Sequence, residues 1–99
     1  MYFCHTPEIW QEFPRLVPGL MVVSGIHPEL DVEPQVKPWF QLARERLDKG
    51  PESQMPEISA WRQAYSRMGL KPSKYRSAAE ALLRRFKREG NLPRLHPLD

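Results

Sequence analysis

A helix, a short basic loop and a second helix follow one another between residues 58 and 90, and this pattern constrains the fold of the 99-residue chain more than any other feature. The first helix has apolar residues at the spacing of one helical stripe: Ile58, Trp61, Tyr65 and Met68. Gly69 follows where a helix can end in the left-handed conformation, and Pro72 prevents the helix from resuming. The two aromatic rings could stack on RNA bases, but their place on the stripe favours burial in the core.

The second helix begins after Ser77. Ser77 and Glu80 have the spacing of a capping box, in which the serine hydroxyl accepts a hydrogen bond from the Glu80 amide and the glutamate reaches back to the serine amide. This structural role accounts for Glu80 better than a role as general base does. The predicted buried face consists of Ala79, Leu82, Leu83 and Phe86. Gly90 then offers a second C-terminal stop.

The loop between the helices, residues 71–76, contains three cations and one aromatic ring. Lys71, Lys74 and Arg76 have the charge to bind RNA phosphates, and Tyr75 has a ring that can stack on an exposed base. The alternative is a loop whose charges only keep it in water, since clusters of charge are common on protein surfaces. The residues alone leave both interpretations open.

The second helix carries four cations within five residues: Arg84, Arg85, Lys87 and Arg88. Glu80 and Arg84 have the spacing of an i, i+4 ion pair, and cations in the last turn complement the helix dipole. These two effects need fewer cations than the helix has, so we expect its basic face, including Arg84, Arg85 and Arg88, to contact RNA. The distribution of charge agrees, because residues 1–60 carry 5 Lys and Arg against 9 Asp and Glu, whereas residues 61–99 carry 10 against 3.

The sequence of this helix–loop–helix also resembles a known family. The resemblance rests on three segments, which are Trp61–Tyr65, Met68–Ser77 and Glu80–Arg85. They are similar to the B3/B4 tRNA-binding domain, which occurs in the beta subunit of bacterial phenylalanyl-tRNA synthetase and in free-standing relatives. A looser similarity covers Glu8–Trp10, Phe13–Pro14, Val22–Gly25 and Leu92–Arg94. The chain as a whole resembles a free-standing member.

The resemblance implies binding of tRNA and a proofreading reaction that hydrolyses a mischarged aminoacyl ester. Such a step has a physical reason, because a hydrophobic pocket rejects a substrate with one added hydroxyl only about a hundredfold. No catalytic residue is assigned, and no cofactor is expected. A second hypothesis is a non-catalytic RNA- or protein-interaction piece that needs a partner to complete its fold. A third is a gene fragment without a stable fold.

The remaining pattern predicts an α+β domain with an incomplete sheet. Leu20 to Ile26 reads as a buried strand, with Met1 to Cys4 as a candidate edge strand and Leu92 to Leu98 as a further extended segment. Helices are expected from Pro7 to Phe13 and from Pro38 to Lys49. Because one central strand needs neighbours on both sides, we expect residues 1–99 to form the N-terminal half of a B3/B4-like domain. A protein partner or a second chain segment would complete the sheet.

Composition limits the other classes of function. The longest strongly apolar run, Leu20 to Val23, is far too short for a signal peptide core or a membrane span, so no membrane contact is expected. The single Cys4 excludes an internal disulfide and agrees with a cytoplasmic location. The three histidines and Cys4 do not have the spacing of a zinc site, so no metal is expected.

Overall fold

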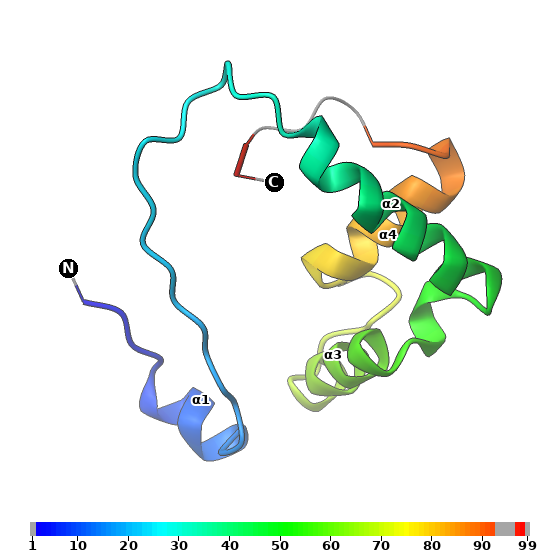
Figure 1. The fold of residues 1–99 in the computed structure, drawn as a ribbon. Helices are drawn as coiled ribbons and strands as arrows, with labels where there is room; N and C mark the ends of the chain where they lie inside the picture. Colours follow the sequence, from blue (N-terminus) through cyan, green and yellow to red (C-terminus); the bar gives the residue numbers. More distant parts are fainter. Residues whose placement is uncertain (1, 93–96, 99) are drawn as a thin grey trace.

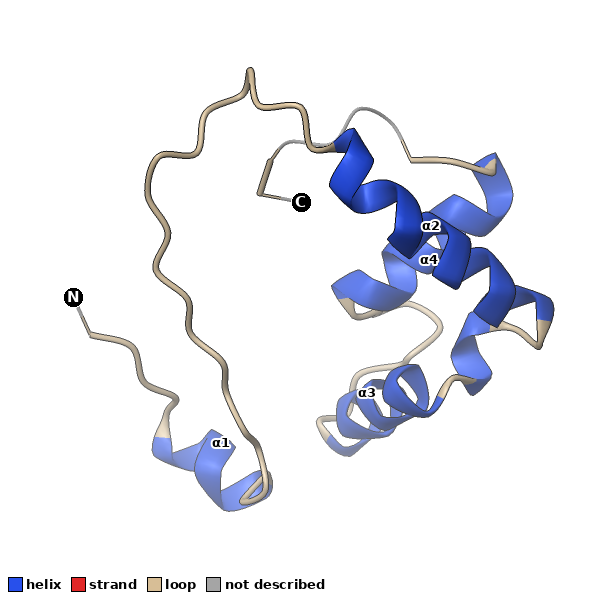
Figure 2. Cartoon of the chain, in the orientation of Figure 1, coloured by secondary structure: helices blue, strands red, loops and turns tan. Residues whose placement is uncertain are grey.

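The computed structural model describes residues 2–92 and 97–98, and the regular elements in this part of the chain are all helical (Figure 2). They are α1 (Pro7–Glu12), α2 (Glu33–Asp48), the 3₁₀ turn η1 (Glu52–Gln54), α3 (Pro56–Arg67) and α4 (Ala78–Glu89). Figure 1 shows α2, η1, α3 and α4 gathered into one helical unit, while a long extended segment connects this unit to α1.

The ends of α3 and α4 lie where the sequence predicts them. After α3, Gly69 has a φ of +76°, and the Leu70 amide donates to the Tyr65 carbonyl over 2.8 Å. The Ser77 hydroxyl accepts from the Glu80 amide at 3.3 Å, which confirms the serine half of the capping box. After α4, Gly90 takes the left-handed conformation at φ +72°.

Helix α2 begins five residues earlier than predicted, at Glu33 rather than Pro38. Pro34 lies in the first turn, where a missing amide costs nothing, and the Asp31 carboxylate accepts from the Glu33 amide at 3.1 Å. Pro38 therefore lies inside the helix, where it removes one backbone hydrogen bond without ending it. The helix ends at Asp48, close to the predicted end.

The core of the helical unit is small. Its buried apolar side chains are Met55, Ile58 and Phe86. The Phe40 ring of α2 lies 5.1 Å from the Phe86 ring, centroid to centroid, which joins α2 to α4. These side chains come from α2, α3, α4 and Met55, the residue between η1 and α3, so the core lies where the four elements meet.

The prediction that the whole apolar stripe of α3 is buried is wrong. Ile58 is 3% exposed, but Trp61 is 48% and Met68 is 41% exposed. Among the described residues α3 packs mainly against η1, which covers the start of the helix and leaves the later turns open to solvent. Leu82 on α4 is half exposed for the same reason, since no described layer covers that side.

The predicted α+β class is also wrong for the described residues, because the segment expected to be a strand has no partner. Leu20 to Ile26 is extended, and its side chains lie in solvent, with Met21 82% and Val22 81% exposed. No backbone amide from Val17 to Ile26 donates a hydrogen bond within the described chain. Apolar β-branched residues favour a strand, but a strand exists only where a second backbone supplies the ladder.

The two other segments considered for the sheet are not strands where the structure describes them. Residues 2–4 are irregular, and so is Leu92. Met1 and residues 93–96, with Asp99, lie outside the described residues.

Helix α1 lies beside the end of α3 (Figure 1). Arg67 donates to the Glu12 carboxylate at 2.8 Å, and its guanidinium lies 4.9 Å from the centre of the Phe13 ring. These exposed contacts are weak individually, so α1 is held to the helical unit mainly through one arginine.

Candidate nucleic-acid interface

The basic loop between α3 and α4 is held in a defined turn. The amides of Lys74 and Tyr75 both donate to the Lys71 carbonyl at 2.9 Å, and Arg62 of α3 donates to the Pro72 carbonyl at 3.5 Å. The backbone of the loop is therefore fixed at its start and at its centre. Lys71, Lys74 and Tyr75 are exposed on this turn, and we call these three residues the loop cluster.

Tyr75 presents an aromatic surface next to positive charge. Its side chain is 46% exposed, and the Lys74 ammonium lies 5.7 Å from the centre of the ring, within the range of a cation–π contact. An exposed ring beside a cation can stack on a nucleobase while the cation binds the neighbouring phosphate.

Arg76, in contrast, is turned toward a buried carboxylate. Glu80 is fully buried; its Oε1 atom accepts from Arg62 at 2.7 Å and lies 3.7 Å from Nε of Arg76. Two guanidinium groups thus face one carboxylate in the interior of the unit. Among the described residues neither Glu80 Oε2 nor Arg76 Nε has a hydrogen-bond partner. Arg76 is therefore attracted to Glu80 by charge alone, whereas Arg62 is also hydrogen-bonded to it. Arg76 ties the end of the loop to α4.

Arg84 is engaged by a second buried carboxylate. It donates to Glu52 of η1 at 2.9 Å, and the Lys87 ammonium lies 3.8 Å from the other Glu52 oxygen. Burial raises the pKa of Glu52, but a backbone hydrogen bond and the charges of Lys87 and Arg84 outweigh this effect and bring the pKa below its ordinary value of 4.5. The predicted pair of Glu80 with Arg84 is not formed, because each residue has a partner on another element.

Arg85 and Arg88 remain at the surface of α4. Both contact Glu89, at 3.2 Å and 2.8 Å, and their hydrogen bonds lower the pKa of Glu89 below its ordinary value. Exposed pairs of this kind contribute little to stability and exchange readily for other anions. The two arginines lie about 60° apart around the helix axis, and Arg88 lies about 17 Å along it from Ser77.

The predicted RNA-binding residues therefore fall into three groups. The loop cluster is exposed and fixed, Arg85 and Arg88 lie exposed near the far end of α4, and Arg76 and Arg84 face buried carboxylates. The sequence analysis did not identify Arg62 and Glu52 as partners. Arg62 had one signal, since it follows Ile58 by four residues and so shares its buried face. Glu52 had none.

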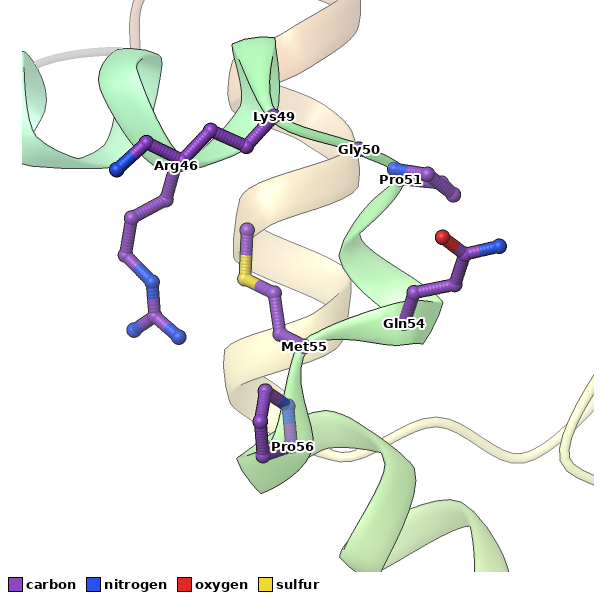
Figure 3. Close-up of a pocket in the computed structure, with 7 residues that line it drawn as sticks. All are labelled: Arg46, Lys49, Gly50, Pro51, Gln54, Met55 and Pro56. Atoms are coloured by element: carbon purple, nitrogen blue, oxygen red, sulfur yellow. The ribbon is translucent and has the colours of Figure 1, made fainter.

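An open pocket of about 290 Å³ lies at the junction of α2, η1 and α3, away from the loop (Figure 3). Met55 projects into the space between Arg46 and Gln54 in this view. Arg46 is held there by both oxygens of Glu57, at 2.8 and 3.0 Å, and this hydrogen bond lowers the pKa of Glu57. With Arg46 neutralised, Lys49 is the remaining cation of the lining, and the lining has no aromatic ring, so the pocket is a weaker candidate for binding RNA than the loop is.

Comparison of the chain with protein-family models, with curated proteins and with solved structures finds no match. The resemblance to the B3/B4 domain therefore stays a prediction from the sequence. In the described part of the chain, none of the helices has both the length and the apolar character that crossing a bilayer requires. Nor do three His, Cys, Asp or Glu side chains gather in the described ranges in a way that could hold a metal ion.

Proposed function

We propose that the chain binds RNA through the loop cluster, with Arg85 and Arg88 as secondary contacts. The observation that carries this proposal is the division of the cations into two classes. Buried carboxylates hold Arg62, Arg76 and Arg84, whereas Lys71 and Lys74 make no ion pair in the described structure. Lys37 and Lys49 also make no ion pair among the described residues, but Lys71 and Lys74 lie on a turn that exposes an aromatic ring beside the Lys74 ammonium.

The fixed backbone of the loop favours binding. Hydrogen bonds to the Lys71 and Pro72 carbonyls hold the turn before any ligand arrives, so binding would order only the side chains. The loop is also tied to both helices, because Arg62 of α3 and Arg76 at the end of the loop face the same carboxylate, that of Glu80 of α4. Arg76 and Arg84, which the sequence suggested as ligands, would then act mainly as positioning residues.

The chemistry of the loop favours RNA with unpaired bases. A ring can stack only on a base whose face is free, as in a single-stranded end, a loop or a bulge. Lysines bind phosphates without regard to sequence, so the site would read an exposed base beside a backbone rather than a particular sequence. A tRNA, which has a single-stranded 3′ end and exposed loops, fits this description and is the partner that the sequence resemblance implies.

Fluorescence anisotropy with labelled RNA tests the proposal. The probes are a tRNA transcript, a single-stranded 12-nucleotide RNA and a 12-base-pair RNA duplex. Replacing both loop lysines (Lys71→Ala with Lys74→Ala) should weaken binding to tRNA and to the single strand by about tenfold or more. The matched control, Lys37→Ala with Lys49→Ala, removes the same charge from α2 and the residue after it and should leave the affinity within about twofold.

Replacing the aromatic ring separates stacking from charge. Tyr75→Leu should weaken binding to the single strand by about five- to a hundredfold while changing binding to the duplex little. Equal losses from the loop and control pairs would show that only overall charge matters and would refute a site at the loop. Hydrolysis of mischarged tRNA, the reaction that the resemblance implies, is a separate prediction that a deacylation assay tests directly.

A further inference from the structure

We propose that the extended segment, residues 16–26, pairs antiparallel with the same segment of a second copy of this chain. The segment is extended from Leu16 to Ser24, and Gly25, with φ +77°, turns the backbone after it. No amide from Val17 to Ile26 is hydrogen-bonded within the described chain. The segment thus has the sequence and backbone of a strand, with both edges open.

The side chains of the segment make solvent exposure costly. The exposed apolar residues are Val17, Leu20, Met21, Val22, Val23 and Ile26. They alternate between the two faces of an extended backbone, so both faces are apolar. Together they expose roughly 700 Å² per chain, against about 800 Å² per partner in a standard protein interface, so covering about half of it would give a weak, reversible complex.

The order of charges along the chain indicates a second copy and an antiparallel direction. Arg15 is the only Lys or Arg among the first 36 residues and lies directly before the segment, whereas Glu29, Asp31 and Glu33 follow it. Glu8 and Glu12 also precede the segment, and Glu12 is already paired with Arg67. Antiparallel pairing brings Arg15 of each copy toward the acidic end of the other. Parallel pairing would place like charges together. The charges nearest the two ends of the segment therefore favour the antiparallel direction.

The pairing also has a natural centre. Arg15 and Glu29 each lie seven residues from Val22, so a two-fold axis at Val22 brings the end of each copy that carries Arg15 toward the end of the other that carries Glu29, outside the extended stretch that Gly25 ends. Leu20 then lies opposite Ser24, and Met21 opposite Val23. Every second backbone amide between Leu20 and Ser24 gains a ladder partner that it lacks in the single chain, and the amides between them face the outer edge.

Sedimentation equilibrium measures this association directly. A two-stranded ribbon is only marginally stable, so we expect a dimer with a dissociation constant on the order of 100 µM, seen over concentrations from about 10 µM to 1 mM. Val22→Lys places two like charges on the axis and should raise the dissociation constant at least about tenfold. Because Val22 is exposed, the helical circular dichroism should not change. Trp39→Lys, at an exposed site on α2, is the control and should leave association unchanged.

Charge exchange tests the direction of pairing. Arg15→Glu alone should weaken the dimer, and the double variant Arg15→Glu with Glu29→Lys should restore it toward the wild-type dissociation constant. A chain that stays monomeric at about 1 mM overturns the proposal. So does a dimer that Trp39→Lys disrupts and Val22→Lys does not, or one that the double charge exchange fails to restore. Loss of the dimer would leave RNA binding at the loop cluster unaffected.

Discussion

The buried Glu80 carboxylate gives the most decisive test of what holds the helical unit together. It has no exposure to solvent, and its one side-chain hydrogen bond comes from Arg62, whose own side chain is 30% exposed. Replacing Arg62 with Met leaves a buried charge whose remaining cation, Arg76, is 3.7 Å away and lacks hydrogen-bonding geometry. Removing one partner of a buried pair costs about 3–5 kcal/mol, and we expect about 3 because Arg76 can move closer.

Replacing the carboxylate instead of the arginine should destabilise the protein less. Glu80→Gln leaves an amide oxygen that can still accept from Arg62, and the exposed part of the arginine can be hydrated, so the expected loss is about 1 kcal/mol. Urea unfolding followed by circular dichroism at 222 nm measures both variants. At a slope of about 1.5 kcal/mol/M, Arg62→Met should lower the midpoint by about 2 M and Glu80→Gln by less than about 1 M.

A double variant provides the control. Arg62→Met with Glu80→Leu replaces both charges with apolar groups and should be more stable than Arg62→Met alone, since no buried carboxylate is left unpaired. The reasoning is refuted if Glu80→Gln destabilises more than Arg62→Met does, or if Arg62→Met unfolds at the wild-type urea concentration.

Three further predictions concern local structure. Ser77→Ala removes the acceptor for the Glu80 amide and should lower the free energy of unfolding by about 1 kcal/mol, whereas Ser73→Ala, at an exposed loop position, should change it little. Gly69→Ala forces a side chain into a φ of +76° and should cost about 1 kcal/mol, while Gly19→Ala, which meets no atom within 4 Å and has no positive φ, should cost almost nothing. Glu52 has a pKa below 4.5 in the folded state, so its contribution is complete above about pH 4.5 and is lost as pH falls through the lower folded pKa; Glu52→Gln should flatten the acid side of a plot of unfolding free energy against pH. A Glu52→Gln profile as steep as the wild type's would contradict this assignment.

Features set by neighbouring residues could be predicted from the sequence. The stops at Gly69 and Gly90 and the serine cap at Ser77 depend on the conformation of one residue and on partners within four positions. In these cases the sequence contains both halves of the interaction within about one turn. Helix α1 also begins where predicted, at Pro7, although Thr6 makes no side-chain cap hydrogen bond.

Features that need a partner far away in the sequence could not be predicted. The 20–26 segment has the residues of a strand, but pairing depends on a second backbone, which the described chain does not provide. Periodicity placed Trp61 on the buried stripe, yet burial requires a neighbouring layer to cover it. The ion pairs followed the same rule, because Glu80 is paired with Arg62, 18 residues away, and not with Arg84 one turn later.

This distinction changes the interpretation of the basic face. Counting cations along the sequence makes Arg76, Arg84, Lys71 and Lys74 equal candidates for binding phosphate. The structure separates them, since buried carboxylates pair with the two arginines, whereas the two lysines make no ion pair among the described residues. Charge that is already neutralised inside the protein releases no counterions from RNA.

The salt dependence of RNA affinity tests that division most directly. The logarithm of the association constant for a single-stranded RNA is measured against the logarithm of salt concentration for wild type, for Lys71→Ala with Lys74→Ala, and for Arg84→Ala, each checked for helical content. The lysine pair should reduce the slope by about 1.4, corresponding to about 0.7 for each lost phosphate contact, while Arg84→Ala should leave it unchanged. An unchanged slope in the lysine variant, or an equal reduction in the Arg84 variant, would contradict a binding site at the loop cluster.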